Sequence, residues 1–525
     1  MSTETNSKPA TSQSAAGTRE KKQIDYFLCL VPLGLVLILN IVFMLRPEQS
    51  TAVVSSLRAF MCDDLGIFYI GFSIFAFVGS LAIAFSKLGT IKLGKGKPQY
   101  SSFVWGSMIF TSTMAADTLF YSLIEWAMYA NEPRIQELGG VLPWASTYTL
   151  FHWGPIAWGF YIICSIAFGF MFHVRGREKQ QFSEACRPLL GDRVDGPIGK
   201  LIDTIGVIGM MASTSTTFSI STPFLAEAVA KIFGISNSAA LSVALLVGTC
   251  LVYTIAVVFG MKAIAKLATI CIYLFLTILA YVFFFGGETK FILENGLESI
   301  GVLIQNFPSL MTYTDPLRST NFAQSWSIFY WSYWVVACVG TPFFIGIISK
   351  GRTIKEMVLG GYAWGVAATF MSFIILGNYG IALDVRHGAG IADFVGETWN
   401  YPAAITMIID QLPLAMVFLF VLVITMLAFY TTTFDSITMV FATFSYKKLR
   451  SDEEPGRGIR IFWAISFIIL PIALIFSEGN LYAMQSFAII AALPVSIVLL
   501  MIIFSFIKDA KAYLRETGAV KEDEE

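Results

Sequence analysis

The sequence predicts an all-α polytopic membrane protein, and two observations carry that prediction. Only 14% of the 525 residues are charged and 56% are hydrophobic, whereas soluble domains have ~25% charged residues. Apolar runs of about 18 or more residues recur along the chain, and each can cross ~30 Å of hydrocarbon as a helix. We therefore expect a lipid membrane as the main partner. The net charge of −1 predicts no nucleic-acid partner.

Twelve segments have the length and polarity of membrane spans. The first follows a polar tail, residues 1–24, and it is too long for a signal-peptide core and lacks a small-residue cleavage site. In chain order the predicted spans are 25–45, 66–86, 101–128, 145–173, 202–230, 238–260, 265–286, 324–348, 357–378, 412–444, 461–478 and 483–507.

The distribution of lysine and arginine between the loops predicts the orientation of these spans. If both termini are cytoplasmic, 28 of these residues lie on the cytoplasmic side and seven on the external side. Positive residues gather on the cytoplasmic side of membrane proteins. This bias predicts a multi-pass protein of the cell inner (cytoplasmic) membrane with both termini inside.

The segment between the seventh and eighth spans has a different character. "LESIGVLIQNF" is apolar on one face and too polar to span. It predicts an amphipathic helix at about 290–318 that lies along the outer surface.

The chain lacks the sequence motifs that are typical of several enzyme classes. The seven cysteines are scattered without a CxxC pair, and the motifs GxxxxGK[ST], HExxH and GxSxG do not occur. We therefore expect neither an enzyme nor an ATP-driven pump, and no cofactor apart from a coupling sodium ion or proton.

The eighth predicted span is unusually aromatic. "WSIFYWSYW" holds six aromatic rings in the nine residues from Trp326 to Trp334. An interfacial aromatic belt explains Trp326, at the outer end of the span. Tyr333 and Trp334 lie ~11–12 Å deeper at 1.5 Å per residue, so they are either packed core or part of a ligand cage.

A cage of rings suits one class of ligand. A quaternary ammonium ion has a permanent charge and no N–H to donate, and aromatic faces attract it by ~0.5–2 kcal/mol per ring. The fourth span offers a second cluster, "FHWGPIAWGFY", with Trp153, Trp158 and Tyr161 around a helix-loosening Gly154-Pro155 pair. His152 in this cluster is read as a packed, hydrogen-bonded histidine.

The third predicted span carries polar groups in an apolar run. "TSTMAADTLFYSLIEW" places several hydroxyls and Asp117 there. A helix that unwinds inside a membrane needs such groups for its freed backbone. We expect Asp117 to lie in this unwound segment, either as a functional carboxylate or as a structural, hydrogen-bonded one.

"HWGPIAW", "YTDP" (313–316), "WSIFYWSYW" and "ISKGRT" (348–353) together resemble the betaine/carnitine/choline transporter (BCCT) family over about residues 25–510. The resemblance implies a leucine-transporter-like inverted repeat of five plus five helices, preceded by two extra helices, in a homotrimer. The transporter domain would comprise extra helices (25–86), repeat one (about 101–286), the external helix and repeat two (about 324–507), followed by a cytoplasmic tail (511–525). The implied substrate is an onium compound.

The resemblance also implies the site residues. The family's tryptophan box falls on Trp153, Trp158, Tyr161 and Trp334, and its central aromatic residues fall on Phe329, Tyr333 and Trp334. Two positions depart from the pattern, because Tyr333 stands where tryptophan is usual and Ala337 where another aromatic is usual. The cage should therefore be roomier.

In the third span TMAAD (113–117) replaces the glycine-rich break of sodium-coupled members. The lost glycines resemble the carnitine exchangers, and Asp117 resembles some choline carriers. Met114 and Asp117 would then face the substrate.

The resemblance places a sodium site at the hydroxyls of Thr432 and Thr433, with backbone carbonyls of Met114 and Phe429. Hard oxygen ligands suit sodium, although helical hydroxyls also bond to the preceding turn. Sodium-independent exchangers carry an arginine where this chain has Ile272, which favours sodium.

We therefore expect a secondary active transporter of a quaternary-ammonium compound such as glycine betaine, carnitine or choline. Sodium symport, proton symport through Asp117 and sodium-independent precursor/product exchange all stay open. A non-transporting ligand receptor is a further alternative, although such a receptor usually carries a soluble signalling domain.

Overall fold

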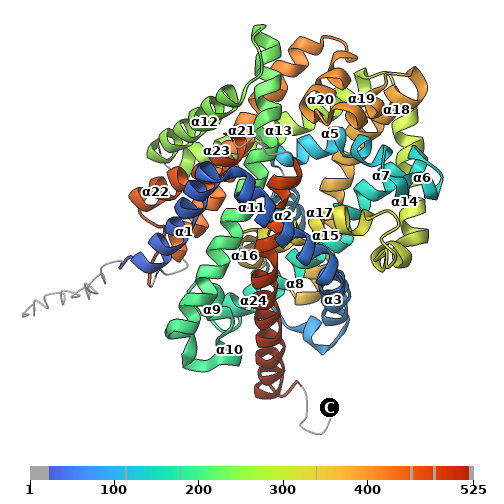
Figure 1. Cartoon of the computed structure of the whole chain (residues 1–525). Coiled ribbons are helices and arrows are strands. Elements are labelled where there is room, and N and C mark those ends of the chain that lie inside the picture. Colours follow the sequence, from blue (N-terminus) through green and yellow to red (C-terminus); the bar gives the residue numbers. More distant parts are fainter. Residues whose placement is uncertain are drawn as a thin grey trace, which may run out of the picture.

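The computed structural model describes residues 23–112, 115–177, 179–259, 261–338, 340–447, 449, 453–476 and 481–519. Within these ranges the chain forms helices and connecting loops (Figure 1). The only extended pairings there are two isolated bridges, Ile24 with Tyr446 and Lys92 with Thr353. The all-α prediction is confirmed.

The helices that correspond to the predicted extra helices and repeat one come first. They are α1 (Tyr26–Leu45), α2 (Pro47–Ala59), the π-helical turn η1 (Phe60–Asp64), α3 (Gly66–Phe85), η2 (Lys87–Thr90), α4 (Ser102–Thr111), α5 (Ala116–Ala130), α6 (Pro133–Leu138), α7 (Val141–His152), α8 (Pro155–His173), α9 (Phe182–Ala185), α10 (Arg187–Leu190), η3 (Gly191–Asp195), α11 (Pro197–Phe233), α12 (Ala239–Phe259) and α13 (Met261–Phe285).

The remaining helices include two more π-helical turns, η4 and η5. They are α14 (Thr289–Met311), η4 (Ala323–Ser327), α15 (Ile328–Ala337), α16 (Thr341–Ile348), α17 (Ile354–Ser372), η5 (Phe373–Gly377), α18 (Asn378–His387), α19 (Ile391–Thr398), α20 (Tyr401–Asp410), α21 (Ala415–Phe444), α22 (Arg457–Phe467), α23 (Ile469–Phe476) and α24 (Leu481–Glu516).

Within the described residues, six helices are long and apolar enough to cross a membrane, or eight if each of two bent pairs is one span. The bent pairs are Thr269–Phe285 with Thr289–Met311, at 110°, and Ala323–Ala337 with Thr341–Ile348, at 55°. The protein is therefore a multi-pass membrane protein. The count of twelve, the inverted repeat and the division into domains stay predictions.

Three of the predicted spans that carry the polar and aromatic segments are broken rather than continuous, and the eleventh is interrupted at Ile468. The third stops at Thr111 and resumes at Ala116, the fourth breaks at Trp153 and Gly154, and the eighth breaks between Ala337 and Thr341. The predicted break in the third span is thus confirmed. Interrupted helices in corresponding halves of a transporter often mark its binding site.

These broken helices lie inside the molecule. Helix α8 packs against α3, α16, α17 and α24, and α24 also packs against α11 and α15. Figure 1 shows α8, α15 and α16 gathered beside the long α24. The aromatic segments therefore face other helices rather than the outside.

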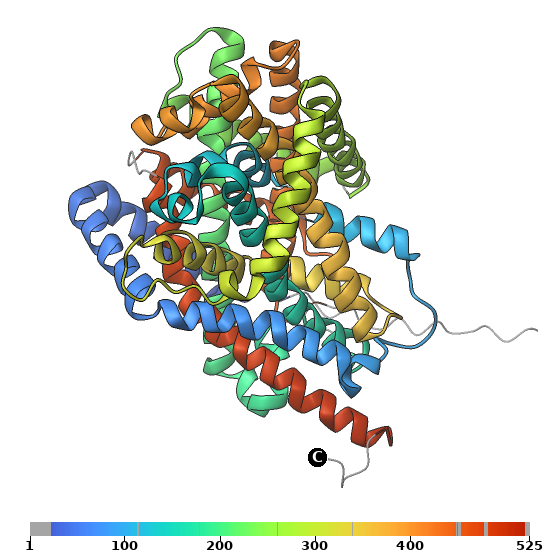
Figure 2. The ribbon, with the colours of Figure 1, turned by 90° about the vertical axis from the view of Figure 1, so that its right-hand side faces the viewer.

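The predicted helix between the seventh and eighth spans exists as α14. It turns 110° away from the end of α13 and packs against α7 and α18. Figure 2 shows α14 running along α7. Its position at a membrane surface stays a prediction. The short helices α2, α19 and α20 were not anticipated from the sequence.

Candidate functional site

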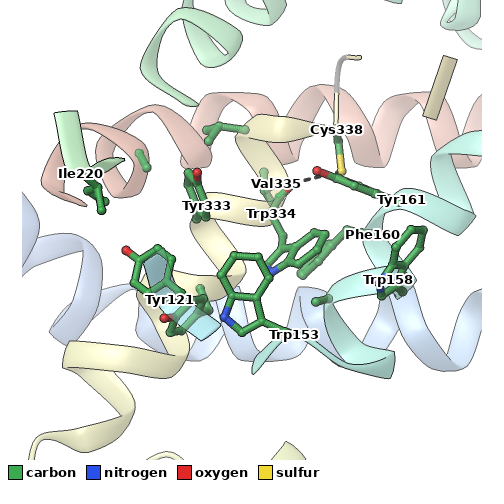
Figure 3. Close-up of a cluster of buried hydrophobic side chains, with 14 of the residues drawn as sticks. Tyr121, Trp153, Trp158, Phe160, Tyr161, Ile220, Tyr333, Trp334, Val335 and Cys338 are labelled. Carbon is green, nitrogen blue, oxygen red and sulfur yellow. Dashed lines mark hydrogen bonds between the residues drawn. The ribbon is translucent and has the colours of Figure 1, made fainter. Parts of the chain in front are cut away.

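The four residues of the predicted tryptophan box meet around one ring. The centroid of Trp334 lies 4.9 Å from Tyr161, 5.6 Å from Trp153 and 6.3 Å from Trp158. All four side chains are buried. Figure 3 shows Trp334 between Trp153 and the pair formed by Trp158 and Tyr161. Residues almost 200 positions apart thus form one aromatic cluster, which we call the cage.

The break in the fourth span positions the first three rings. Trp153 ends α7 with a non-helical backbone, and Pro155 starts α8. A Cβ at Gly154 would lie 2.2 Å from the carbonyl oxygen of Leu150, so only glycine fits between the two helices. The Gly-Pro pair therefore turns Trp153 out of the regular helix toward Trp334.

The indole N–H groups of the cage differ in their partners. Trp153 Nε1 donates to Glu125 Oε2 at 2.8 Å. The Nε1 atoms of Trp158 and Trp334 are buried without a hydrogen-bond partner within the described residues. Buried donors usually have acceptors, so these two are available to a polar group of a ligand.

Phe329 and Tyr333 lie beside the cage and not in it. Phe329 stacks on Tyr333 with a centroid distance of 5.7 Å. The Tyr333 hydroxyl forms short hydrogen bonds with Asp117 Oδ2 and Thr217 Oγ1. The substitution of tyrosine for the family's usual tryptophan therefore supplies a hydroxyl for Asp117.

Asp117 lies in the first turn of α5, just after the break, and not in the unwound segment that the sequence suggested. Its Oδ1 accepts the backbone N–H of Thr118 at 2.9 Å, and its Oδ2 accepts Tyr333 and, at 3.5 Å, Thr217. The N-terminus of a helix stabilises a negative charge. The start of α5 therefore stabilises the carboxylate of Asp117. Met114, predicted beside it, lies outside the described residues.

A second buried carboxylate lies at the site, Glu125, to which the family resemblance assigned a structural or gating role and not a place among the site residues. Glu125 is fully buried, two turns after Asp117, and its Oε1 accepts the Tyr129 hydroxyl at 2.5 Å. Tyr129 also bonds to His152 Nδ1 at 2.7 Å, and His152 Nε2 to Ser327 Oγ at 3.0 Å. The prediction of a packed, hydrogen-bonded His152 is confirmed. The i, i+4 spacing of Glu125 and Tyr129 was the available signal.

The belt interpretation of Trp326 is wrong. Its side chain is only 6% exposed, and its Nε1 donates to Glu132 Oε1 at 2.8 Å. Its ring meets Tyr129 edge-on at 4.9 Å. Because a carboxylate satisfies the indole N–H inside the protein, the ring does not need the membrane interface.

The predicted sodium ligands are only partly assembled. Thr432 Oγ1 donates to the carbonyl oxygens of Phe429, at 3.0 Å, and Ala428, at 3.3 Å. Both Thr432 and Thr433 are half-buried in the continuous helix α21. The hydroxyl chemistry fits sodium, but Thr432 uses its hydroxyl on its own helix, and the Met114 ligand falls outside the described residues.

The aspartate of "YTDP" proves to be a loop cap. Asp315 accepts the backbone N–H groups of Ser319, Thr320 and Asn321 at 2.7–3.0 Å, and the hydroxyls of the first two. Burial opposes ionisation, but these hydrogen bonds outweigh it and lower the pKa of Asp315 to about 2. This carboxylate therefore fixes the loop that leads into η4 and α15.

Comparisons with known proteins agree with this arrangement. The family model described as "BCCT, betaine/carnitine/choline family transporter" matches residues 27–515. A carnitine transporter of Acinetobacter baumannii is 27% identical over 442 residues, which cover 83% of this chain and 80% of the relative. An uncharacterized transporter of Escherichia coli, YeaV, is 27% identical over 433 residues, 81% of this chain and 89% of the relative.

The matched range contains all three broken spans, the cage and Asp117. Members of this family are transporters and not enzymes. The chain belongs to the betaine/carnitine/choline transporter family.

Proposed function

We propose that this protein is a secondary active transporter of a quaternary-ammonium compound such as glycine betaine, carnitine or choline. The observation that carries the proposal is the convergence of Trp153, Trp158 and Tyr161 on Trp334 beside three broken helices. A permanent cation without N–H groups is the ligand class that such rings recognise best. The carnitine transporter among the relatives supports the same class.

Asp117 favours choline within this class. Choline has no carboxylate of its own, so a buried aspartate next to the cage adds Coulombic attraction for it. The same charge repels the carboxylate of a betaine or of carnitine. In contrast, the free indole N–H groups of Trp158 and Trp334 would accommodate a substrate carboxylate or hydroxyl.

The coupling ion is proposed to be sodium, held by Thr432 and Thr433 with carbonyl groups of Met114 and Phe429. Proton symport through Asp117 is an alternative route. Sodium-independent precursor/product exchange is the second candidate function, and one observation favours it. The predicted carbonyl ligand Phe429 lies inside the continuous helix α21, which has no break there to free its carbonyl group for an ion.

We further propose that the protein works as a homotrimer in the cell inner membrane with both termini in the cytoplasm. The charge bias of the loops and the family membership support this assembly and orientation. No cofactor other than the coupling ion is invoked.

Reconstitution in liposomes tests the function. The purified protein is given labelled choline, glycine betaine or carnitine under a sodium gradient, under a proton gradient, or with unlabelled substrate inside. Accumulation under a gradient identifies a symporter, and uptake only against internal substrate identifies an exchanger. Binding without movement under every condition would contradict transport and indicate a receptor.

The sodium site has a matched control in the same helix. In the double variant Thr432→Ala/Thr433→Ala, sodium-driven uptake should be lost while substrate binding at high concentration persists. Thr431→Ala is the control, because the Thr431 hydroxyl bonds to the Leu427 carbonyl at 2.9 Å on the buried side of α21. Wild-type uptake that ignores sodium would remove this site from the mechanism.

A further inference from the structure

We propose that Glu125 is a positioning residue of the cage. It holds the indole of Trp153 in place and, as a buried carboxylate behind that ring, strengthens the attraction of the ring for a permanent cation. The inference rests on the proposed function, because it specifies how one ring of the onium site is tuned.

The contacts of Glu125 use both carboxylate oxygens. Oε2 accepts Trp153 Nε1 at 2.8 Å, and Oε1 accepts the Tyr129 hydroxyl at 2.5 Å. The residue is 0% exposed. Hydrogen bonds donated to both oxygens favour the ionised form of a carboxylate.

A chain of hydrogen bonds leads from Glu125 through Tyr129 and His152 to Ser327. Tyr129 donates its single proton to Glu125, so its oxygen accepts from His152 Nδ1 at 2.7 Å. His152 Nε2 is then the acceptor for the Ser327 hydroxyl at 3.0 Å. The neutral tautomer of His152 with its proton on Nδ1 completes this chain, with every donor pointing toward Glu125.

The negative charge of Glu125 has no cationic side chain beside it. Within the described ranges no lysine or arginine forms an ion pair with Glu125. A buried charge without a counter-ion is costly. An onium group bound on the face of Trp153 would be the nearest cation, separated from the carboxylate by the ring alone.

Trp153 needs this support more than its neighbours do. It lies between α7 and α8 with a non-helical backbone, so regular helical packing does not orient its side chain. Its carbonyl oxygen accepts the Thr369 hydroxyl at 2.8 Å, which anchors the backbone, and Glu125 anchors the ring. A charge-assisted bond to the N–H also pushes electron density into the indole, which makes its face more attractive to a cation.

A nearby carboxylate offers an internal control. Glu132, seven residues after Glu125 and at the N-cap of α6, accepts Trp326 Nε1 at 2.8 Å. This second carboxylate–indole pair has the same chemistry. Among the described residues, however, the Trp326 ring packs on Tyr129, 4.9 Å away between centroids, and not on a ring of the cage. Each carboxylate accepts one indole N–H, and Glu125 accepts the Tyr129 hydroxyl as well; only the indole bonded to Glu125 belongs to the cage.

The test is a binding measurement on the detergent-purified full chain with two competitors. One is choline, and the other is its neutral isostere in which C(CH₃)₃ replaces N(CH₃)₃⁺. Glu125→Gln should weaken choline about tenfold and the neutral isostere by less than about twofold. Glu132→Gln should leave both within about twofold of the wild type. A purely structural role of Glu125 would weaken both ligands equally, and that result would overturn the proposal.

A double-mutant cycle provides the second arm. Trp153→Phe keeps an aromatic face but removes the N–H, so Glu125→Gln should cause a smaller further loss in that background than in the wild type. An equal loss with and without the indole would overturn the proposal. If Glu125→Gln does not fold, Trp153→Phe is compared with Trp158→Phe, because the indole N–H of Trp158 has no partner among the described residues. The choline-specific loss should be larger at Trp153, and an equal loss at both positions would overturn the proposal. Wild-type protein that binds neither choline nor another onium compound would instead refute the proposed function.

Discussion

The third and eighth predicted spans are both broken, but the two breaks carry opposite chemistry. The third resumes as α5 with a carboxylate, Asp117, in its first turn. The eighth ends α15 with aromatic rings, of which Trp334 is the centre of the cage. The two segments are joined by the hydrogen bond from Tyr333 to Asp117. One broken helix thus supplies a carboxylate and the other supplies ring faces, the combination that suits the proposed onium substrate.

The comparison also explains how the polar break is accommodated inside the protein, where no ion pair to Asp117 forms among the described residues. A helix N-terminus and two hydroxyls stabilise Asp117. The aromatic break needs no such partners, because rings pack on rings. We therefore expect the two halves of the site to fail differently when altered.

The largest effect should come from the aromatic half. Trp334→Ala removes the ring that contacts the other three, and it should weaken onium binding by about 1–3 kcal/mol, roughly 5- to 150-fold. The measurement is the half-saturation of uptake for labelled substrate. Trp331→Ala is the control, since Trp331 is equally buried in α15 but packs on Phe151 and Phe160. Near-wild-type half-saturation in Trp334→Ala would show that the rings are only core.

A smaller and more selective effect should come from the polar half. Asp117→Asn should weaken choline about tenfold, ~1.4 kcal/mol, and spare glycine betaine, because only choline depends on the added charge. Tyr333→Phe, which removes the hydroxyl donor to Asp117, should weaken choline relative to glycine betaine by a smaller factor. Competition between choline and glycine betaine measures this affinity ratio. If Asp117→Asn abolishes pH-dependent accumulation but not exchange, Asp117 carries the coupling proton instead. No change in affinity, selectivity or pH response would leave Asp117 a structural residue.

The smallest effect on ligand affinity is expected for Asp315, which caps the loop before η4 and α15. Asp315→Asn should leave half-saturation unchanged but lower the stability of the folded protein by roughly 2 kcal/mol at neutral pH. The pKa of Asp315 is lowered to about 2. Its stabilisation is therefore complete above the ordinary aspartate value of ~3.9 and is lost as the pH falls toward about 2. Thermal unfolding between pH 3 and 7 checks this, and identical curves for both proteins would contradict the cap.

Much of the site could be predicted from residue types. The ring-rich segments, the Gly154-Pro155 pair and the hydroxyls before Asp117 each indicate their chemistry locally, because helix breaks and cation-binding rings depend on composition. The four rings of the cage were also named from the sequence through the family resemblance. Their meeting at Trp334 is a contact between distant segments, and it follows from how α8 packs against α15 and α16.

The sequence by itself determined that this protein is a helical membrane protein, that its third span unwinds and its fourth is loosened at Gly154-Pro155, and which residue types lie there, because hydropathy and backbone preference are local properties. It did not reveal the break in the eighth span. Only the tertiary structure decided which partners the polar groups take. It buried Trp326 on Glu132, paired Tyr333 with Asp117 and placed Glu125 behind Trp153. Inside a membrane protein a polar side chain must find its partner on another helix, and the packing of helices chooses that partner.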